Sequence, residues 1–572
     1  MDERRRSISR RRFLRDALWL LSAAALPKLT GCVALTSPTA QSQSVAPTGT
    51  ATLSPTATTE PSPTATAVAD GPFFDPSSLK PVYVAHHPSL GGYAAASPFD
   101  PPEIYPELPY VSGTAPDNGA YYLVRESLRI YSPSGYGTPD WNPLGSLIRP
   151  GDRVLIKPNL VDASAWANGQ TTHPAFLRPI IDYVYKACGP QGAIMVGDAP
   201  WSVDVFDSLV QVTGIREMVE YLAQTHGLPV ILADLNNTGG KEAPLVDLGA
   251  LSELWAVDRI WYDAHGNVMQ DRPEPGVGRY RIAPAVLEAD VILSVPKAKV
   301  HCSGGITVAM KNMIGLIPAW DGSYGDGVLK DCAHTSDLDR AAGERGIYLD
   351  NDTIWRSMAD LNRILLYADK TGMVQMTPQR RYLALVDAVV AAEASQYDPR
   401  PYPLNTVILA TDPISADAVT ARCMGFDPRK LRSVVRPAGG RILPLGTADP
   451  AALAIVTSSG KGLDAHFRQA LTPELYVYSW QGHLEASDFD GPQVQDWSWD
   501  GVGQHLRVAL HDPSGVAWAR LAYVWQGEQR VKALELRDGV WTVDLPLGEE
   551  VRQGILTTGD GLFNETVREI EW

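Results

Sequence analysis

The stretch GDRVLIKPN, residues 151–159, shows a pattern that recurs through the middle of this chain. Its short apolar run, Val154 to Ile156, ends directly in the charged Lys157, and stretches with helical spacing separate it from later runs of the same kind. Buried parallel strands connected by crossover helices have this pattern. We therefore predict an α/β domain whose mostly parallel sheet carries helices on both faces.

The recurring pattern is a β-branched apolar run that ends in a polar residue or a turn. The predicted strands are Arg153 to Ile156, Ala193 to Val196, Pro229 to Leu232, Val291 to Val295, Tyr382 to Val386 and Thr406 to Ala410. A helix is predicted over Pro174 to Ala187. We expect a doubly wound or three-layer arrangement and assign it to residues 73–468.

Beyond about Leu471 the sequence changes to short alternating runs, at residues 505–510, 518–524, 531–536 and 540–545. The turn signal Asp538-Gly539 separates the last two. These features predict an antiparallel, Ig-like β-sandwich over residues 469–572, which would serve as a spacer or would dock to a component of the cell envelope. Its tryptophans, among them Trp497, Trp499, Trp518 and Trp541, could bind carbohydrate, although packing of the core is their commoner use.

The amino terminus has the order of an export signal. Arginines at positions 10–12 precede an apolar run, Ala17 to Leu26, which predicts the twin-arginine route. That run is roughly ten residues, whereas a transmembrane helix needs about twenty. Leu29-Thr30-Gly31-Cys32 resembles a lipoprotein box, so residues 1–32 are interpreted as a signal with Cys32 as the lipidated residue; an ordinary signal peptide is the alternative.

Residues 33–72 consist almost wholly of Ser, Thr, Pro, Ala and Gln and predict a flexible tether. The expected location is the outer face of the cytoplasmic membrane or the cell envelope, through a lipid anchor. The net charge of −16 argues against nucleic acid as a partner. Cysteines of the mature body, at positions 188, 302, 332 and 423, lack the close spacing of zinc or iron–sulfur sites.

Polar residues follow most of the predicted strands. In open parallel sheets ligands bind beyond the carboxyl ends of the strands, so these residues would converge on one rim. The expected set comprises Lys157, Asn159, Asp198, Lys299, His301, Asp387, Asp412 and Asp417. Single residues of this kind often cap helices, but a gathering of cations and carboxylates in a cleft favours a functional site.

Residues 301–315, HCSGGITVAMKNMIG, read as a glycine-rich turn that enters a helix. Unpaired backbone N–H groups at a helix start favour an anion. Thr307 and Lys311 would share one face of that helix and meet the same bound group. A glycine turn chosen for close packing is the alternative. The substrate-binding residues predicted for the rim and this turn are Lys157, Asn159, Lys299, Gly304, Gly305, Thr307 and Asn312.

Three histidines are candidates for acid/base chemistry or metal binding: His173, His301 and His334. Capping or surface positions are more usual for a single histidine. Residues 322–352 form a polar segment that could close over the rim. Cys302, beside a glycine turn, is a weaker candidate for a reactive thiol.

As a set, these motifs resemble the domain-of-unknown-function 362 family from about Gly151 to about Ala438. The motifs that carry the resemblance are residues 151–159, 196–198, 299–301 with Thr307, Lys311, Asn312 and Gly315, and 412–417. The resemblance implies a fold core and site positions, but no reaction is established for the family. Some members carry ferredoxin-like iron–sulfur modules; the cysteine spacing here departs from theirs, so no cluster is expected.

A fainter similarity concerns His301, Ser303-Gly304-Gly305 and Lys311, which together resemble the nickel-pincer lactate racemase family. In that family a lysine binds the pincer cofactor, and the resemblance implies a racemase or epimerase as one alternative. The spacing between Gly305 and Lys311 differs from the family's pattern.

The sequence thus leads to two hypotheses. The first is an exported enzyme for a small anionic substrate, with Lys311, His301 and Asp198 as catalytic residues and Asp198, Asp412 and Asp417 binding a divalent metal or moving a proton. The second is a non-catalytic solute-binding or surface-adhesion lipoprotein.

Overall fold

The structure, a computed structural model, describes residues 74–90, 92–93, 96–161, 169–237, 243–254, 278–318, 351–475, 480–501, 504–525, 527–545, 551 and 553–572. All of them belong to one compact unit, Ala69–Trp572. The export signal with Cys32, the tether, Cys332, His334 and most of the polar segment 322–352 lie outside the described residues.

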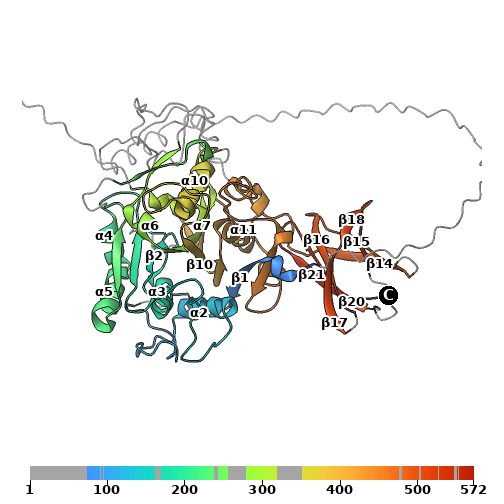
Figure 1. Ribbon diagram of the computed structural model, residues 1–572, viewed down its shortest axis with the longest axis horizontal. Helices are drawn as coiled ribbons and strands as arrows, with labels where there is room; N and C mark the ends of the chain where they lie inside the picture. Colours follow the sequence, from blue (N-terminus) through green and yellow to red (C-terminus); the bar gives the residue numbers. More distant parts are fainter. Residues whose placement is uncertain are drawn as a thin grey trace, which may run out of the picture. The chain divides into compact units, whose positions relative to one another are not determined.

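A large mixed sheet forms the centre of the α/β body (Figure 1). Its path runs β13 (Leu453–Thr457), β1 (Lys80–His86), β12 (Thr406–Ala410), β10 (Arg381–Glu393), β7 (Val291–Val295), β2 (Arg153–Pro158), β3 (Ala193–Asp198) and β4 (Val230–Asp234). Attached to β10 are β11 (Arg400–Tyr402) and β8 (Lys297–His301), and β8 pairs with β9 (Gly305–Thr307). All six predicted strands are therefore confirmed.

Strands β10, β7, β2, β3 and β4 run parallel, as predicted. The expectation that the sixth predicted strand is parallel is wrong, because β12 pairs antiparallel with both β1 and β10. Ala410 at the end of β12 lies opposite Ala384, near the start of β10. Asp412, which follows β12, therefore lies at the other end of the strands from Lys157 and Asp198, and not on the predicted rim.

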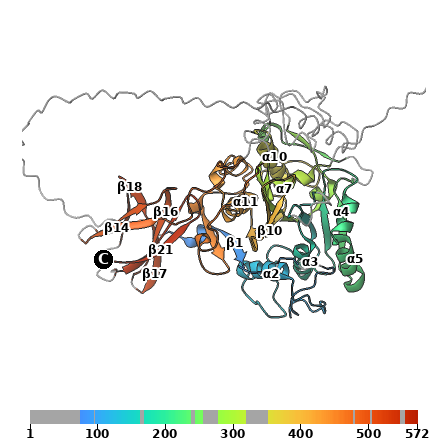
Figure 2. The same cartoon turned by 180° about the vertical axis from the view of Figure 1, so that it is seen from behind.

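Helices cover both faces of the sheet, as predicted (Figures 1 and 2). Side chains of β2 alternate between two separate cores: Leu155 belongs to one, Val154 and Ile156 to the other. The core that contains Val154 includes α2 (Gly119–Tyr131), α3 (Pro174–Cys188), α4 (Phe206–Val212) and α5 (Ile215–His226). The core that contains Leu155 includes α6 (Pro284–Glu288), α7 (Ala309–Asn312), α10 (Ile354–Tyr367), α11 (Pro413–Cys423) and α12 (Arg432–Val435).

Smaller elements complete the body. A two-stranded ladder joins β5 (Leu245–Asp247) to β6 (Arg279–Arg281). The short 3₁₀ turns are η1 (Pro76–Ser78), η3 (Gly249–Leu251), η4 (Met313–Leu316), η5 (Pro428–Lys430), η6 (Pro450–Ala452) and η7 (Leu463–Ala465). Within the described ranges, no helix has the length and apolar character needed to cross a bilayer.

The carboxyl-terminal residues form two four-stranded antiparallel sheets, which confirms the predicted sandwich. One sheet has the order β14 (Gln493–Asp500), β15 (His505–His511), β19 (Val540–Asp544) and β18 (Glu535–Arg537). The other has the order β17 (Glu528–Ala533), β16 (Val516–Trp525), β20 (Gln553–Asp560) and β21 (Glu565–Glu571). Asp538 and Gly539 both have positive φ, at 50° and 80°, as the predicted turn between β18 and β19 requires.

The predicted run over residues 531–536 is divided in the structure. Leu534, whose side chain is buried in the sandwich core, separates β17 from β18, and these two strands belong to different sheets. The tryptophans at positions 497, 499 and 541 pack against the same core, and Trp518 is itself buried. Core packing thus accounts for these four aromatic side chains.

Candidate functional site

The β8–β9 hairpin gathers two basic residues singled out from the sequence, Lys299 and His301, with a third, Lys297. Lys297, Lys299 and His301 alternate along β8, so their side chains project from the same face of the strand, and all three are buried. Across the hairpin Thr307 pairs with Lys299 and Gly305 pairs with His301. Gly305 has a φ of 75°, and a Cβ there would lie 2.9 Å from a methyl group of Leu431. The glycine therefore permits both the turn and its close packing.

Lys157 is engaged in a buried ion pair at the ends of β2 and β3. Its Nζ lies 2.7 Å from Asp198 Oδ1 and donates to Asn312 Oδ1 at 3.0 Å. Asp198 also accepts from the backbone N–H groups of Leu160 and Ala199, at 2.7 and 2.8 Å. Burial lowers the pKa of Lys157, which the Asp198 carboxylate opposes. These contacts give Lys157, Asp198 and Asn312 a role in joining the strand ends.

A second buried ion pair involves Lys297. Its Nζ lies 3.0 Å from Asp387 Oδ2 and also donates to the hydroxyl of Tyr93. Tyr93 in turn donates to Asp387 Oδ1 at 2.6 Å, and its ring stacks on His173 at 3.9 Å between centroids. Burial lowers the pKa of Lys297, against the effect of Asp387. The positive charge of Lys297 is thus matched within the protein.

Lys299 differs from these two lysines in its partners. Its Nζ donates to the backbone oxygen of Gln170 at 2.7 Å and to Gln170 Oε1 at 3.0 Å. Among the described residues, no carboxylate lies within 4.0 Å of this ammonium group. The pKa of Lys299 is well below its ordinary value because of burial first, and then because of the nearby Lys311 and Lys297.

Thr307, directly opposite Lys299, carries a second unbalanced group. The residue is 1% exposed, and within the described part of the chain its Oγ1 has no hydrogen-bond partner. A buried hydroxyl that makes no hydrogen bond costs about 1–3 kcal/mol. Lys299 and Thr307 together therefore offer a buried amino group and a buried hydroxyl to a bound oxyanion, which would favour the protonated form of Lys299.

Two of the three candidate histidines are described. The backbone N–H groups of Ser303 and Gly304 donate to His301 Nδ1 at 3.1 and 3.2 Å, so the neutral ring carries its proton on Nε2. His173 caps α3, because its Nδ1 accepts from the N–H of Ala175 at 3.1 Å. The pKa of His173 is well below its ordinary value because of burial and the Lys297 charge. His173 is thus a capping residue, and the ring of His301 is held by the backbone of the turn that follows β8.

Lys311 lies on α7 and is partly buried. Burial and the Lys157 charge lower the pKa of Lys311 to about 8, whereas Cys302 acts in the opposite direction. The prediction that Thr307 and Lys311 share a helical face is wrong, because Thr307 belongs to β9 and α7 begins at Ala309. The start of α7 is also not an anion site, since the N–H of Met310 donates to Asp417 Oδ1 at 3.1 Å.

The three predicted metal ligands do not form one group. Asp412 caps α11 by accepting from the N–H of Ser415 at 2.7 Å, and it pairs with Lys80 Nζ at 2.7 Å. Asp417 supports α7, and burial raises the pKa of Asp417 to about 8. Within the described residues, the carboxylates close enough to share a metal ion are instead Asp488, Asp512 and Asp560, in and beside the sandwich. The set of Asp198, Asp412 and Asp417 does not fit a single metal ion.

The remaining predicted residues have structural roles. Asn159 accepts from the N–H of Thr172 through its backbone oxygen and donates its own N–H to Thr172 Oγ1, at 2.9 Å in each case. A Cβ on Gly304 would lie 3.2 Å from Met358. Burial raises the pKa of the Cys302 thiol, which disfavours a reactive thiolate.

Sequence reasoning missed Gln170 and Tyr93 as partners of the lysines. Gln170 follows a stretch, residues 162–168, that the structure does not describe, and no motif marks it. The alternation of Lys297, Lys299 and His301 was a usable signal, because residues two apart share one face of a strand.

Comparisons with known proteins agree with the family resemblance. The family profile named domain of unknown function (DUF362) matches residues 154–422. A thylakoid-associated protein of Synechocystis sp. is 25% identical over 175 residues, which cover 31% of this chain and 42% of that protein. The chain thus spans less than half the length of this curated relative.

Two solved structures show weaker likenesses. The lactate racemase apoprotein from Thermoanaerobacterium thermosaccharolyticum is 13% identical over 53% of this chain and 55% of that one, with a TM-score of 0.28. A protein from Thermotoga maritima is also 13% identical, over 49% of this chain and 53% of that one, with a TM-score of 0.27. These TM-scores are too low to bear on the chemistry of the site.

Proposed function

We propose that the chain is an enzyme that binds a small anionic substrate at the β8–β9 hairpin and transfers a proton to or from it. The observation that carries this proposal is the pairing of Lys299 with Thr307 across the hairpin. The described partners of the buried Lys299 ammonium group are neutral oxygens. The buried hydroxyl of Thr307 makes no described hydrogen bond. An oxyanion would accept from both groups and offset the cost of burying them.

One nearby group, Lys311, has a property suited to proton transfer. Lys311, with a pKa of about 8, gains and loses its proton close to neutral pH. The ring of His301, on the neighbouring β8, is fixed in orientation by two backbone donors to its Nδ1. Lys311 would serve as the base or acid. No step in this scheme requires a metal ion.

Anion titration by isothermal calorimetry tests the proposed site, with inorganic phosphate, sulfate and malonate as probes. The wild type is expected to bind at least one of them. Lys299→Met should weaken that affinity roughly 10- to 100-fold, since a hydrogen bond to a charged group contributes about 1.5–3 kcal/mol. Thr307→Val should weaken it about fivefold, because only a neutral donor is lost.

Lys370→Met is the matched control for the lysine substitution. Its side chain is 64% exposed and pairs with Asp290 away from the hairpin. The control should bind the anion as tightly as the wild type. If Lys299→Met binds as tightly as this control, or if no anion binds the wild type, the proposed site is wrong.

A non-catalytic solute-binding protein is the second candidate. The observation that favours it is the engagement of the carboxylates, because Asp198 and Asp387 are both held in buried ion pairs and are not poised for catalysis. Exchange of substrate-bound hydrogen for deuterium in heavy water separates the two candidates. Incorporation that is lost in Lys311→Met supports the enzyme, whereas binding without incorporation supports the second candidate.

We further propose that the protein is exported and held at the membrane by a lipid on Cys32, on the basis of its amino-terminal arginines, apolar run and Leu-Thr-Gly-Cys sequence. Cys32→Ala is expected to move the protein from the membrane pellet to the soluble fraction of fractionated cells, because the attachment site is lost. Replacement of Arg11 and Arg12 by lysine should block export altogether. If Cys32→Ala remains in the pellet, the lipid anchor is excluded.

A further inference from the structure

Helix α11 contacts both the lysine-bearing α7 and the carboxyl-terminal sandwich. Every residue of α11 is buried, from Pro413 to Cys423. A helix that is buried on all sides belongs to the interior of a protein, not to its surface. Figures 1 and 2 show α11 on the side of α7 that faces the sandwich strands. The sandwich is therefore packed against an internal element of the α/β body.

We infer that the sandwich positions α7 through α11, with Arg422 and Asn564 as the positioning residues. This inference rests on the proposed function in one respect: it assumes that the position of Lys311, which the sandwich would help to maintain, matters for the site. The mechanical coupling itself can be measured without any ligand.

The sandwich end of this connection is a buried hydrogen-bonded pair. Arg422 Nε donates to Asn564 Oδ1 at 3.0 Å, its Nη2 donates to the same oxygen, and its Nη1 donates to the backbone oxygen of Phe467 at 2.8 Å. Both Arg422 and Asn564 are 0% exposed. A guanidinium group in this environment depends on its hydrogen bonds, because water cannot replace them.

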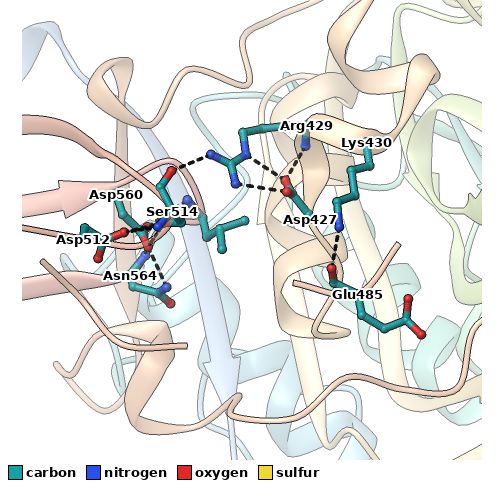
Figure 3. A network of polar contacts seen from close by, with 9 residues as sticks. Asp427, Arg429, Lys430, Glu485, Asp512, Ser514, Asp560 and Asn564 are labelled. Atoms are coloured by element: carbon teal, nitrogen blue, oxygen red, sulfur yellow. Dashed lines mark hydrogen bonds and ion pairs between the residues drawn. The ribbon is translucent and has the colours of Figure 1, made fainter. Parts of the chain in front are cut away.

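Asn564 is held in turn by Asp560 at the end of β20. Its backbone N–H donates to Asp560 Oδ1 and its side-chain amide donates to Asp560 Oδ2, both at 2.8 Å. These two bonds with Asp560 fix the orientation of the amide (Figure 3), and its oxygen accepts from Arg422. The acceptor for Arg422 is therefore preorganised by the sandwich.

A second contact fastens the segment that follows α11. Arg429 on η5 donates to the backbone oxygen of Ser514 at 3.0 Å and is held by Asp427 at 2.9 Å (Figure 3). Ser514 donates its hydroxyl to Asp560 Oδ2 at 2.8 Å. Both arginines therefore connect to the same aspartate of the sandwich.

The other end of the connection is the backbone of α7. Asp417 on α11 accepts from the N–H of Met310, and Asn362 on α10 donates to the backbone oxygen of Met310 at 2.9 Å. The peptide groups next to Lys311 are thus fixed by two neighbouring helices. A shift of α11 would move the Asp417 acceptor and loosen the turn that presents Lys311.

Hydrogen–deuterium exchange on the full chain tests the inference, with peptides that cover α7 and, as an internal reference, β7. Asn564→Ala removes the acceptor of Arg422, and exchange in the α7 peptide is expected to rise about tenfold while β7 is unchanged. Arg422→Lys keeps the charge but loses the forked donor, and should give the same result if Asn564→Ala fails to fold. Asp417→Ala serves as the positive control for α7.

Arg568→Ala is the matched control within the sandwich. Arg568 donates to the backbone oxygen of Val494, so its loss weakens the sandwich without touching α11. This variant should leave exchange in α7 unchanged. If Asn564→Ala and Arg422→Lys raise exchange only in the sandwich and in α11, the inference is overturned.

The affinity of the site for its anion supplies a second readout. Asn564→Ala is expected to weaken the best anion of the calorimetric panel about tenfold, with no change in Arg568→Ala. If the wild type binds none of the anions, the proposed function fails, while the exchange data still decide the coupling. If anions bind and exchange in α7 does not respond to Asn564→Ala or Arg422→Lys, only the coupling fails.

Discussion

Lys157→Met is expected to destabilise the protein by about 3–5 kcal/mol, because the substitution leaves the Asp198 carboxylate buried without its counter-charge. Lys157 is 0% exposed and Asp198 is 4% exposed, so water cannot replace the lost partner. The ion pair also joins β2 to β3, since Asp198 accepts from the N–H of Leu160 beyond β2. Denaturant unfolding at neutral pH measures the effect as a lower midpoint.

A double-mutant cycle identifies the cause of that loss. Asp198→Asn removes the charge and keeps one oxygen, which can accept from either the Leu160 or the Ala199 amide, because these two N–H groups donate to different carboxylate oxygens. The double variant should therefore be more stable than the sum of the two single losses implies, by at least about 1 kcal/mol. Strict additivity would show that the two side chains do not interact, contrary to the 2.7 Å contact between them.

The Lys157–Asp198 ion pair also restricts which residue can occupy position 315, which is distant in sequence. A Cβ on Gly315 would lie 1.9 Å from Asp198 Oδ1 and 2.7 Å from Lys157 Nζ. Both atoms are held by other hydrogen bonds, so neither can move aside without breaking one. The family resemblance marked Gly315 as part of a motif, but the close approach that requires glycine depends on the fold.

The sequence predicted the sheet more fully than it predicted the direction of its strands. Apolar runs marked all six predicted strands, because burial on both faces selects continuous apolar residues. The direction of β12 left no such trace, since an antiparallel strand buried on both faces has the same composition as a parallel one. That one reversal removed Asp412 from the rim.

The site shows a similar division. Residue types and strand ends identified Lys157, Lys299, His301 and Lys311 as a basic group. The structure buries the first three and leaves Lys311 partly buried. Their individual roles depend on partners that are distant in sequence, such as Asp198 for Lys157 and Gln170 for Lys299. Spacing cannot reveal such partners, because the fold alone brings them together.

Lys311→Met is expected to raise stability at neutral pH, by about 3 kcal/mol at most. Lys311 has a pKa lowered from 10.5 to about 8 in the folded protein, and each unit corresponds to about 1.4 kcal/mol. Below about pH 8 both the folded and the unfolded states carry the proton, and the folded state bears the full cost of the partly desolvated charge. Methionine fills a similar volume without that cost.

The sign of the pH dependence distinguishes this explanation from a simple packing effect. Between about pH 8 and 10.5 the unfolded wild type holds a proton that the folded protein has released, so wild-type stability rises with pH relative to the variant. The advantage of Lys311→Met should therefore be largest below pH 8 and disappear near pH 10.5. Melting temperatures of both proteins across this range measure it, with Lys370→Met as the exposed control. If the stability advantage of Lys311→Met is the same at every pH, the pKa of Lys311 is not lowered. If the advantage shrinks as the pH rises, the protein keeps a destabilising charge at the position where the proposed proton transfer requires it.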